Sequence, residues 1–226
     1  KKDGSKPFAV GSTNKNETVS EGDYTNMKNY LGTSVKDGSN FVDQIQKRSG
    51  DVNMNGIYDV YDYAFTMFQL DGGTKQSGEE SGQATLCAEK SCIRAGETVT
   101  FTVLAEDAKH VNAFGAVIDY DPSHLEFVSA VGTKAVGAME NLTVNKVYSD
   151  GTAYVNLAFA NRGDQPLYSG SDELAVITMK ARTDLCPAEE MNVDKLLLIV
   201  PAYDVAGEND TDEKKDIEGQ KESEEK

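Results

Sequence analysis

The sequence predicts a multidomain chain, in which a small all-α unit is followed by an all-β sandwich. The first 70 residues contain an internal repeat, because DYTNMKNYL from Asp23 aligns with DYAFTMFQL from Asp62, 39 residues later. From residue 84 onward, eight short runs rich in valine, threonine and aromatic residues alternate with turn signals, as in antiparallel sandwiches. Between them, residues 71–83 contain no apolar side chain and read as a flexible linker.

The clearest motif of the helical unit is the stretch 51–62, DVNMNGIYDVYD. It has oxygen-bearing side chains at its first, third, fifth, ninth and twelfth positions and glycine at its sixth, the spacing of an EF-hand calcium loop. A surface turn without metal would not explain why all six positions match together. We therefore expect one tightly bound Ca²⁺ in this loop. Its predicted ligands are Asp51, Asn53, Asn55, the carbonyl of Ile57, Asp59 and Asp62.

The first copy of the loop departs from this pattern at two positions. Ser12 replaces a carboxylate, and Glu17 occupies the position where the sharp turn favours glycine. Both changes lower the affinity for calcium. We expect this second site to be weak or empty. Its ligand positions are Ser12, Asn14, Asn16, Thr18, Ser20 and Asp23.

Helices are expected next to both loops. Ser39 or Asn40 can cap a helix over residues 41–48, which leads into the second loop. After that loop, residues 59–70 are apolar on nearly every side. The residues expected to face inward are Tyr63, Met67 and Leu70. A second stripe consists of Tyr61, Phe65 and Phe68. Either this second stripe completes the core of the unit or it binds a partner.

These features resemble a known family. Two loop–helix copies joined by a short segment, with Asp62 instead of glutamate closing the second loop, are characteristic of dockerins. Residues 8–70 therefore resemble a divergent, EF-hand-like dockerin module. The resemblance implies calcium binding and a protein partner for the stripe formed by Tyr61, Phe65 and Phe68.

The β-rich part shows the alternation of a half-buried strand. Val99, Phe101, Val103 and Ala105 are expected to point to one side, with threonines between them on the other. SDG at residues 149–151 predicts a hairpin turn. The eight predicted strands are 84–88, 97–106, 113–121, 125–131, 142–149, 152–160, 173–182 and 193–200.

Four segments carry a second resemblance: IRAGETVTFTV from Ile93, VNAFGAVIDYDPSHLEFVSA from Val111, YVNLAFAN from Tyr154 and DELAVITMKAR from Asp172. Through them, residues 84–206 resemble a cohesin, the jelly-roll receptor of dockerins. The resemblance implies that one sheet face binds the dockerin, and that the first strand joins the opposite sheet. The strands implied for this face are 113–120, 142–148, 153–160 and 174–181. The sequence does not settle which side chains of these strands face outward, because a shift of one residue in the strand register moves every side chain to the other face of the sheet.

Composition and missing motifs argue against several classes of function. The net charge of −16 argues against nucleic acid as a partner, and no run of about 18 apolar residues predicts a membrane span. No signal peptide precedes Lys1, so we expect the sequence to be a piece of a longer protein. No GxSxG, HExxH, Walker or GxGxxG pattern occurs, and an enzyme is not expected. The three cysteines allow either one disulfide with a free thiol or three buried thiols.

Together, these observations predict a non-catalytic, calcium-dependent recognition protein of the dockerin–cohesin type. We expect it to be extracellular and to belong to a secreted, multimodular bacterial protein, either a carbohydrate-active enzyme or a scaffold. The partner module lies either in the same chain or in another protein. The alternative is a carbohydrate-binding β-sandwich with a calcium-stabilised helical appendage. Residues 1–7 and 207–226 are expected to be disordered.

Overall fold

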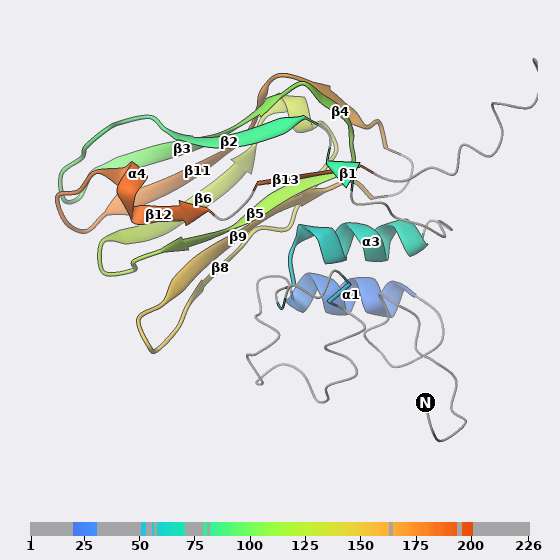
Figure 1. The fold of residues 1–226 in the computed structure, drawn as a ribbon. Coiled ribbons are helices and arrows are strands. Elements are labelled where there is room, and N and C mark those ends of the chain that lie inside the picture. The colour runs from blue at the N-terminus through green and yellow to red at the C-terminus, as the bar shows by residue number, and fades with distance from the viewer. Residues whose placement is uncertain are drawn as a thin grey trace, which may run out of the picture.

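The computed structural model describes residues 20–30, 51–52, 56, 58–70, 79–80, 82–162, 165–193 and 196–200. In these residues, two antiparallel sheets form a sandwich, and helices pack against one of its outer faces (Figure 1). The predicted fold class, a helical unit with an all-β sandwich, is confirmed. The expectations for residues 1–7, 41–48 and 207–226 lie outside the described residues.

One sheet, which we call the helix-facing sheet, carries the helices on its outer side. Its strands follow the order β1-β13-β5-β9-β7, with β12 also pairing with β5 and β8 with β9. The strands are β1 (Glu79–Glu80), β5 (Ala113–Tyr120), β7 (Glu140–Asn141), β8 (Val144–Val147), β9 (Ala153–Ala160), β12 (Met191–Val193) and β13 (Leu197–Val200).

The second sheet has the order β2-β3-β11-β6. Its strands are β2 (Gln83–Ala88), β3 (Thr98–Glu106), β6 (Leu125–Gly132) and β11 (Glu173–Ala181). A separate pair is formed by β4 (Ala108–Val111) and β10 (Tyr168–Gly170). Two short helices complete the sandwich, η1 (Lys134–Val136) and α4 (Pro187–Glu190). The eight predicted runs correspond to β2, β3, β5, β6, β8, β9, β11 and β13; the shorter strands were not predicted.

The main core lies between the two sheets. Along β3, burial alternates as predicted, with Val99, Phe101, Val103 and Ala105 buried. Across the helix-facing sheet, the rings of Phe114 and Phe159 stack with their centroids 4.9 Å apart. The hairpin turn predicted at residues 149–151 joins β8 to β9 and has Gly151 at a φ of 87°.

The chain enters the sandwich by joining both sheets in turn. β1 pairs with β13 in the helix-facing sheet, and β2 then pairs with β3 in the other (Figure 1). Gly82 makes this crossing, with a φ of 77°, and a Cβ there would lie 2.3 Å from the carbonyl oxygen of Glu106. The first predicted strand, 84–88, is β2, and it joins the sheet opposite the helices as the resemblance implied. The two-residue strand β1 before it was not predicted.

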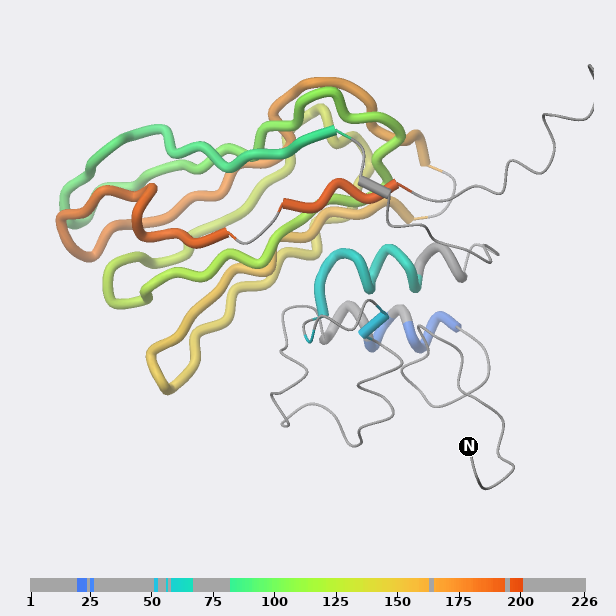
Figure 2. Tube along the Cα trace, viewed as in Figure 1, coloured from blue at the N-terminus to red at the C-terminus, as the bar shows by residue number. Residues whose placement is uncertain are grey.

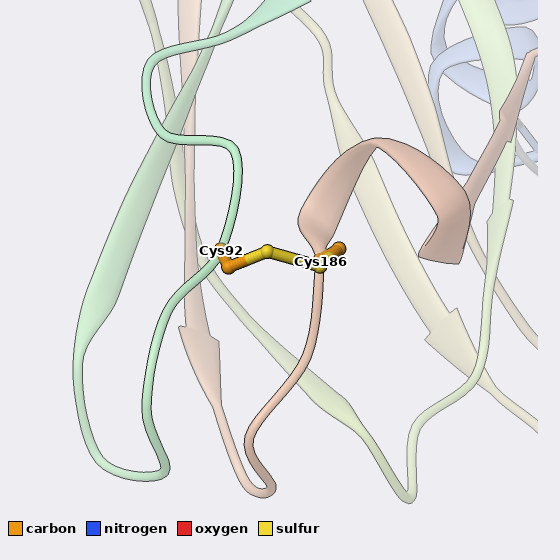
Figure 3. The surroundings of a disulfide bond; sticks show 2 residues. All are labelled: Cys92 and Cys186. Atoms are coloured by element: carbon orange, nitrogen blue, oxygen red, sulfur yellow. A yellow bond between two sulfur atoms is a disulfide. The ribbon is translucent and has the colours of Figure 1, made fainter.

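A disulfide joins Cys92, in the loop after β2, to Cys186, directly before α4 (Figure 3). An isolated β-bridge between Ile93 and Leu185 holds the same two segments together. Cys87 is a free, exposed thiol. Of the two alternatives left open by the sequence, one disulfide with one free thiol is confirmed, and three buried thiols is wrong.

Two longer helices, α1 (Glu21–Tyr30) and α3 (Val60–Leu70), lie side by side, and α3 lies between α1 and the sandwich (Figures 1 and 2). In β13, Leu198 faces the main core while Ile199 faces α3, so both sides of this strand are covered. No helix in the part of the chain that the structure describes is long and apolar enough to span a membrane.

Candidate docking interface and calcium loop

Helix α3 begins with a reciprocal cap made by two aspartates. Asp59, directly before the helix, accepts a hydrogen bond through Oδ1 from the amide of Tyr61 at 2.8 Å. Asp62 accepts through Oδ2 from the amide of Asp59 at 3.0 Å. Two of the amides that a helix start leaves without partners are therefore satisfied, and the aspartates also face the positive end of the helix dipole.

The same carboxylates close the loop before the helix. Asp62 also accepts through Oδ1 from the amide of Val52 at 2.6 Å, ten residues back in the chain. Asp51 accepts through Oδ2 from the amide of Gly56 at 3.0 Å. Gly56 has a φ of 87°, a conformation that glycine adopts without steric cost. The sequence pattern at 51–62 thus folds as a closed loop at its described positions.

Three aspartate side chains of this loop are buried. The exposed fractions of Asp51, Asp59 and Asp62 are only 6, 5 and 0%. Burial raises the pKa of Asp62 well above its ordinary value, and the negative charges of Asp59 and then Asp51 raise it further. Buried carboxylates of like charge require a compensating cation or protons, because an uncompensated buried charge is strongly unfavourable.

This donor set suits a hard cation such as Ca²⁺, which prefers carboxylate and carbonyl oxygens. Among the described residues, no three acidic, histidine or cysteine side chains are grouped closely enough to hold a metal ion by themselves. The other predicted ligands, Asn53, Asn55 and Ile57, lie outside the described residues. The carboxylates present therefore fit calcium in their chemistry.

The first copy of the repeat starts its helix in a similar way. Asp23, directly equivalent to Asp62, accepts hydrogen bonds through Oδ2 from the amide and the hydroxyl of Ser20 at 2.8 and 2.7 Å. Ser20 thus presents a donor where the second copy has the carboxylate of Asp59. The described part of the first copy keeps the helix cap with one negative charge fewer. The predicted positions Ser12, Asn14, Asn16 and Thr18 lie outside the described residues.

The end of the second loop and α3 share an apolar cluster with the helix-facing sheet, which we call the interface cluster. All its fully buried members are at most 5% exposed: Tyr58, Val60, Tyr63, Ala64, Ala113, Leu142, Ala158, Ala160 and Ile199. Tyr61, Val144 and Leu197 pack against it and are partly buried. Because alanines supply much of the sheet side, the helix can approach the sheet closely.

Gly115 in β5 shows how close this approach is. A Cβ at this position would lie 3.0 Å from Cγ1 of Val60 and 2.1 Å from the carbonyl oxygen of Leu157. Any side chain larger than hydrogen would therefore displace the start of α3 or the neighbouring strand. Glycine at this position therefore lets the start of α3 pack directly on the sheet.

Three polar contacts surround the interface cluster. Asn156 in β9, which is fully buried, donates through Nδ2 to the carbonyl oxygen of Tyr58 at 2.7 Å. The hydroxyl of Tyr63 lies 3.5 Å from Oε2 of Glu140. At the rim, the guanidinium of Arg162 donates to both carboxylate oxygens of Glu21 in α1, at 2.8 and 2.7 Å.

The strands of this face differ from the predicted set in one member. β5, β8 and β9 contribute to it, but residues 174–181 form β11 in the opposite sheet, and that part of the prediction is wrong. β13 takes its place beside β5. Sequence order alone does not say which sheet a strand joins, whereas the apolar run of β13 suits a strand covered on both sides.

The described side chains of α3 do not divide between a core and a partner surface as the two predicted stripes did. Tyr63, expected in the core of the helical unit, lies in the interface cluster instead. Of the predicted partner stripe, Tyr61 packs against that cluster and Phe65 is half-buried. The side chains of Met67, Phe68 and Leu70 lie outside the described residues.

Sequence reasoning missed the polar contacts of the sheet. Asn156 stands alone among apolar residues in AYVNLAFA, and this interruption is the one signal that could have marked it. Arg162 had no such signal, because its partner Glu21 is 141 residues away in the chain.

Comparison with known proteins identifies both modules. A family model described as the dockerin type I domain matches residues 11–70, and a model described as the cohesin domain matches residues 83–220. The chain belongs to the cohesin family. Its cohesin domain follows a dockerin type I domain, so both resemblances found in the sequence are confirmed. Cohesin and dockerin modules are non-catalytic and pair with each other, which makes this a protein–protein recognition chain of the cellulosome type.

Several solved cohesins are similar to this chain. The cohesin module of a family 33 glycoside hydrolase from Clostridium perfringens has 8% identity and a TM-score of 0.39, covering 52% of this chain and 82% of that one. A type II cohesin from the cellulosome of Acetivibrio cellulolyticus has 15% identity and a TM-score of 0.35, covering 46% and 70%. A non-cellulosomal cohesin from the archaeon Archaeoglobus fulgidus has 17% identity and a TM-score of 0.32, covering 44% and 66%. Comparison with curated proteins found no match.

Proposed function

We propose that the cohesin domain of this chain binds the dockerin domain of the same chain, in a calcium-dependent manner. The observation that carries this proposal is the interface cluster, in which Tyr58, Val60 and Tyr63 of the dockerin are fully buried against the cohesin sheet. A large aromatic side chain buried in this way typically contributes about 2 kcal/mol or more to an interface.

Tethering favours this pairing over pairing between chains. The segment between the end of α3 and the start of β1 is short, residues 71–78. Joining two modules by so short a segment raises the effective concentration of one around the other to about millimolar. Even a modest contact would then be saturated within the chain. β1, the first strand after this segment, joins the helix-facing sheet itself.

Calcium would act by holding the second loop in its closed form. Asp51, Asp59 and Asp62 would hold the ion together with Asn53, Asn55 and the carbonyl of Ile57. The ion would neutralise the buried carboxylates of the loop. In the first copy, Ser20 supplies a hydroxyl instead of a carboxylate, and its hydroxyl hydrogen already binds Asp23. We therefore propose one strong calcium site, with the first site weak or empty.

The wider setting follows from the same features. The disulfide between Cys92 and Cys186 is typical of proteins folded in an oxidising environment, which supports an extracellular location. The net charge of −16 suits a soluble protein in a calcium-rich medium. We propose that the chain is part of a secreted, multimodular bacterial protein, either a carbohydrate-active enzyme or a scaffold, in which these two modules form a structural joint.

The test cuts the linker while leaving both modules intact. A protease site introduced near Ser77 is cleaved in the full chain, and the product is separated by size in calcium and then in chelator. We expect the two fragments to elute together in calcium and apart in chelator. Fragments that separate in calcium would contradict docking within the chain, and an uncut species at twice the monomer mass would indicate pairing between chains.

A further inference from the structure

We infer that Asn156 is the residue through which the cohesin sheet senses whether the second calcium loop is closed. This inference rests on the proposed calcium-dependent docking and assigns its coupling to one side chain. Asn156 contacts the dockerin through the carbonyl of Tyr58, which lies in the loop itself, next to the predicted ligand Asp59.

The coupling follows from the geometry of a single peptide bond. The carbonyl of Tyr58 and the amide of Asp59 belong to the same peptide unit. Asn156 donates to this carbonyl at 2.7 Å, and the amide donates to Oδ2 of Asp62 at 3.0 Å. In a trans peptide the two groups point in opposite directions from one rigid plane, and no described peptide bond is cis. Asp62 on one side and Asn156 on the other therefore hold the same plane.

The rotation of this plane links the loop to the sheet. Asp62 also binds the amide of Val52 at the start of the loop, so its position depends on the loop being closed. If the loop opens and Asp62 moves, the peptide plane is released and the carbonyl of Tyr58 no longer points at Asn156. Polarisation of the shared peptide strengthens each hydrogen bond when the other is present.

The buried surroundings of Asn156 favour the closed loop over the open one. Its side chain is fully buried, and its register partners are Val117 in β5 and Val144 in β8. Its Oδ1 atom is buried and accepts no hydrogen bond from the residues that the structure describes. Burying an amide that finds too few partners is unfavourable. A loop that fails to present the carbonyl of Tyr58 would leave both halves of this amide without partners, so the sheet disfavours the open loop.

The inferred coupling must act in both directions. If closing the loop improves docking, docking must improve the affinity of the loop for calcium by the same factor. A change at Asn156, which lies in β9 of the sandwich and is not a predicted calcium ligand, should therefore weaken calcium binding.

The test measures calcium affinity in the full chain by titration calorimetry. The first variant is Asn156→Leu, which keeps the branched shape and the number of heavy atoms but removes the donor, and the second is Asn156→Ala. The matched control is Asn145→Ala, which removes an amide from the adjacent strand β8, where it accepts from the hydroxyl of Tyr120 at 2.8 Å. Hydrogen exchange of α3 in calcium and in chelator reports docking in the same samples.

We expect both Asn156 variants to bind calcium about ten-fold more weakly than the unmodified chain, as for the loss of one buried hydrogen bond. Exchange of α3 should become faster in calcium, and the Asn145→Ala control should change neither quantity. Unchanged calcium affinity in Asn156→Leu would overturn the inference, and so would an effect seen only in Asn156→Ala, because packing would then explain it. If α3 in the unmodified chain exchanges equally in calcium and chelator, the proposed function itself fails.

Discussion

The two modules of this chain are stabilised in different ways. The cohesin domain has its own core between two sheets and a disulfide that joins two of its loops. In the described part of the dockerin, by contrast, the buried apolar side chains Tyr58, Val60, Tyr63 and Ala64 all belong to the interface cluster. Its buried polar side chains are the carboxylates of the helix caps and the calcium loop, with Thr66.

This difference suggests a dependence of one module on the other. The cohesin needs neither helix nor ion to fill its core, because its alternating strands face each other across the sandwich. The dockerin buries Tyr58 and Tyr63 against the cohesin sheet and holds three buried carboxylates in the loop that we propose binds calcium. We therefore expect its order to depend on docking and on calcium, and both can be removed experimentally without changing the sandwich.

Loss of calcium should separate the two modules most strongly. Asp51→Ala removes a charged ligand, and because metal binding contributes directly to folding free energy, we expect α3 to lose nearly all its protection from hydrogen exchange. The strands of the cohesin should keep theirs. The control is Asp150→Ala, which removes an exposed carboxylate from the hairpin turn of the sandwich. Full protection of α3 in Asp51→Ala would show that the dockerin is stable without its ion.

Loss of the disulfide should instead lower the stability of the cohesin sandwich. The bond between Cys92 and Cys186 spans 94 residues, and closing a loop of this size typically stabilises a domain by about 4 kcal/mol. Replacing both cysteines by alanine should lower the free energy of unfolding of the sandwich by this amount, measured in urea. Cys87→Ser, at the free exposed thiol, is the control and should have little effect. Equal stability of the double variant and the control would contradict this role of the disulfide.

The two modules also differ in what their sequences revealed. The loop at 51–62 could be recognised because calcium coordination fixes residue types at fixed spacing. The strands could be recognised because burial on one side imposes a period of two, as at Val99, Phe101 and Val103. Both signals are local, and they predicted the two folds, whereas the families followed from the resemblance of the motifs.

The contact between the modules could not be predicted in the same way. Asn156 and Tyr58 are 98 residues apart, and one asparagine in an apolar strand does not name its partner. Helix periodicity showed that α3 has two apolar stripes, but it could not say which stripe meets which surface. Tyr63, expected in the core of the helical unit, lies in the interface cluster. β11 was assigned to the wrong sheet because its alternation is the same in either sheet.

Truncation of Tyr63 tests which side of α3 carries the docking. Its side chain is fully buried in the interface cluster, and we expect Tyr63→Ala to weaken docking by about 2 kcal/mol or more. Phe65→Ala, at a half-buried position of the same helix, should weaken it less. Co-elution of the fragments after linker cleavage measures both variants. A larger effect for Phe65→Ala would favour the predicted partner stripe of Tyr61, Phe65 and Phe68, which stays a prediction.

The ion pair at the rim should contribute much less. Arg162 and Glu21 form a bidentate contact, but their side chains are 47 and 71% exposed, and such pairs contribute at most about 1 kcal/mol. Arg162→Ala should therefore weaken docking slightly, and the difference should disappear at high salt. The control is Arg182→Ala, whose partner Glu126 lies within the sandwich. A salt-independent loss of docking would show that Arg162 acts through packing of its side chain instead.

The smallest expected effect lies wholly in the cohesin and depends on pH. His124, in the turn before β6, lies 2.8 Å through Nδ1 from Oε2 of Glu190 in α4. The hydrogen bond to Glu190 and its negative charge raise the pKa of His124 above its ordinary value of 6.5, with a smaller contribution from Asp121. Because the folded pKa is the higher one, the pair stabilises the sandwich fully below pH 6.5, and this stabilisation is lost as the pH rises through the raised pKa.

The urea midpoint of the sandwich, followed from below this range to above it, should therefore decline slightly in the unmodified chain. In His124→Gln, which cannot titrate, this part of the decline should be absent. Exchange of α3 should not follow the same curve, because both partners of the pair belong to the sandwich and neither is part of the interface cluster. The same slope in both proteins would show that His124 does not titrate with folding. A matching change in α3 would show that the stability of the cohesin is transmitted to the docked dockerin, and the separation between the modules would then be incomplete.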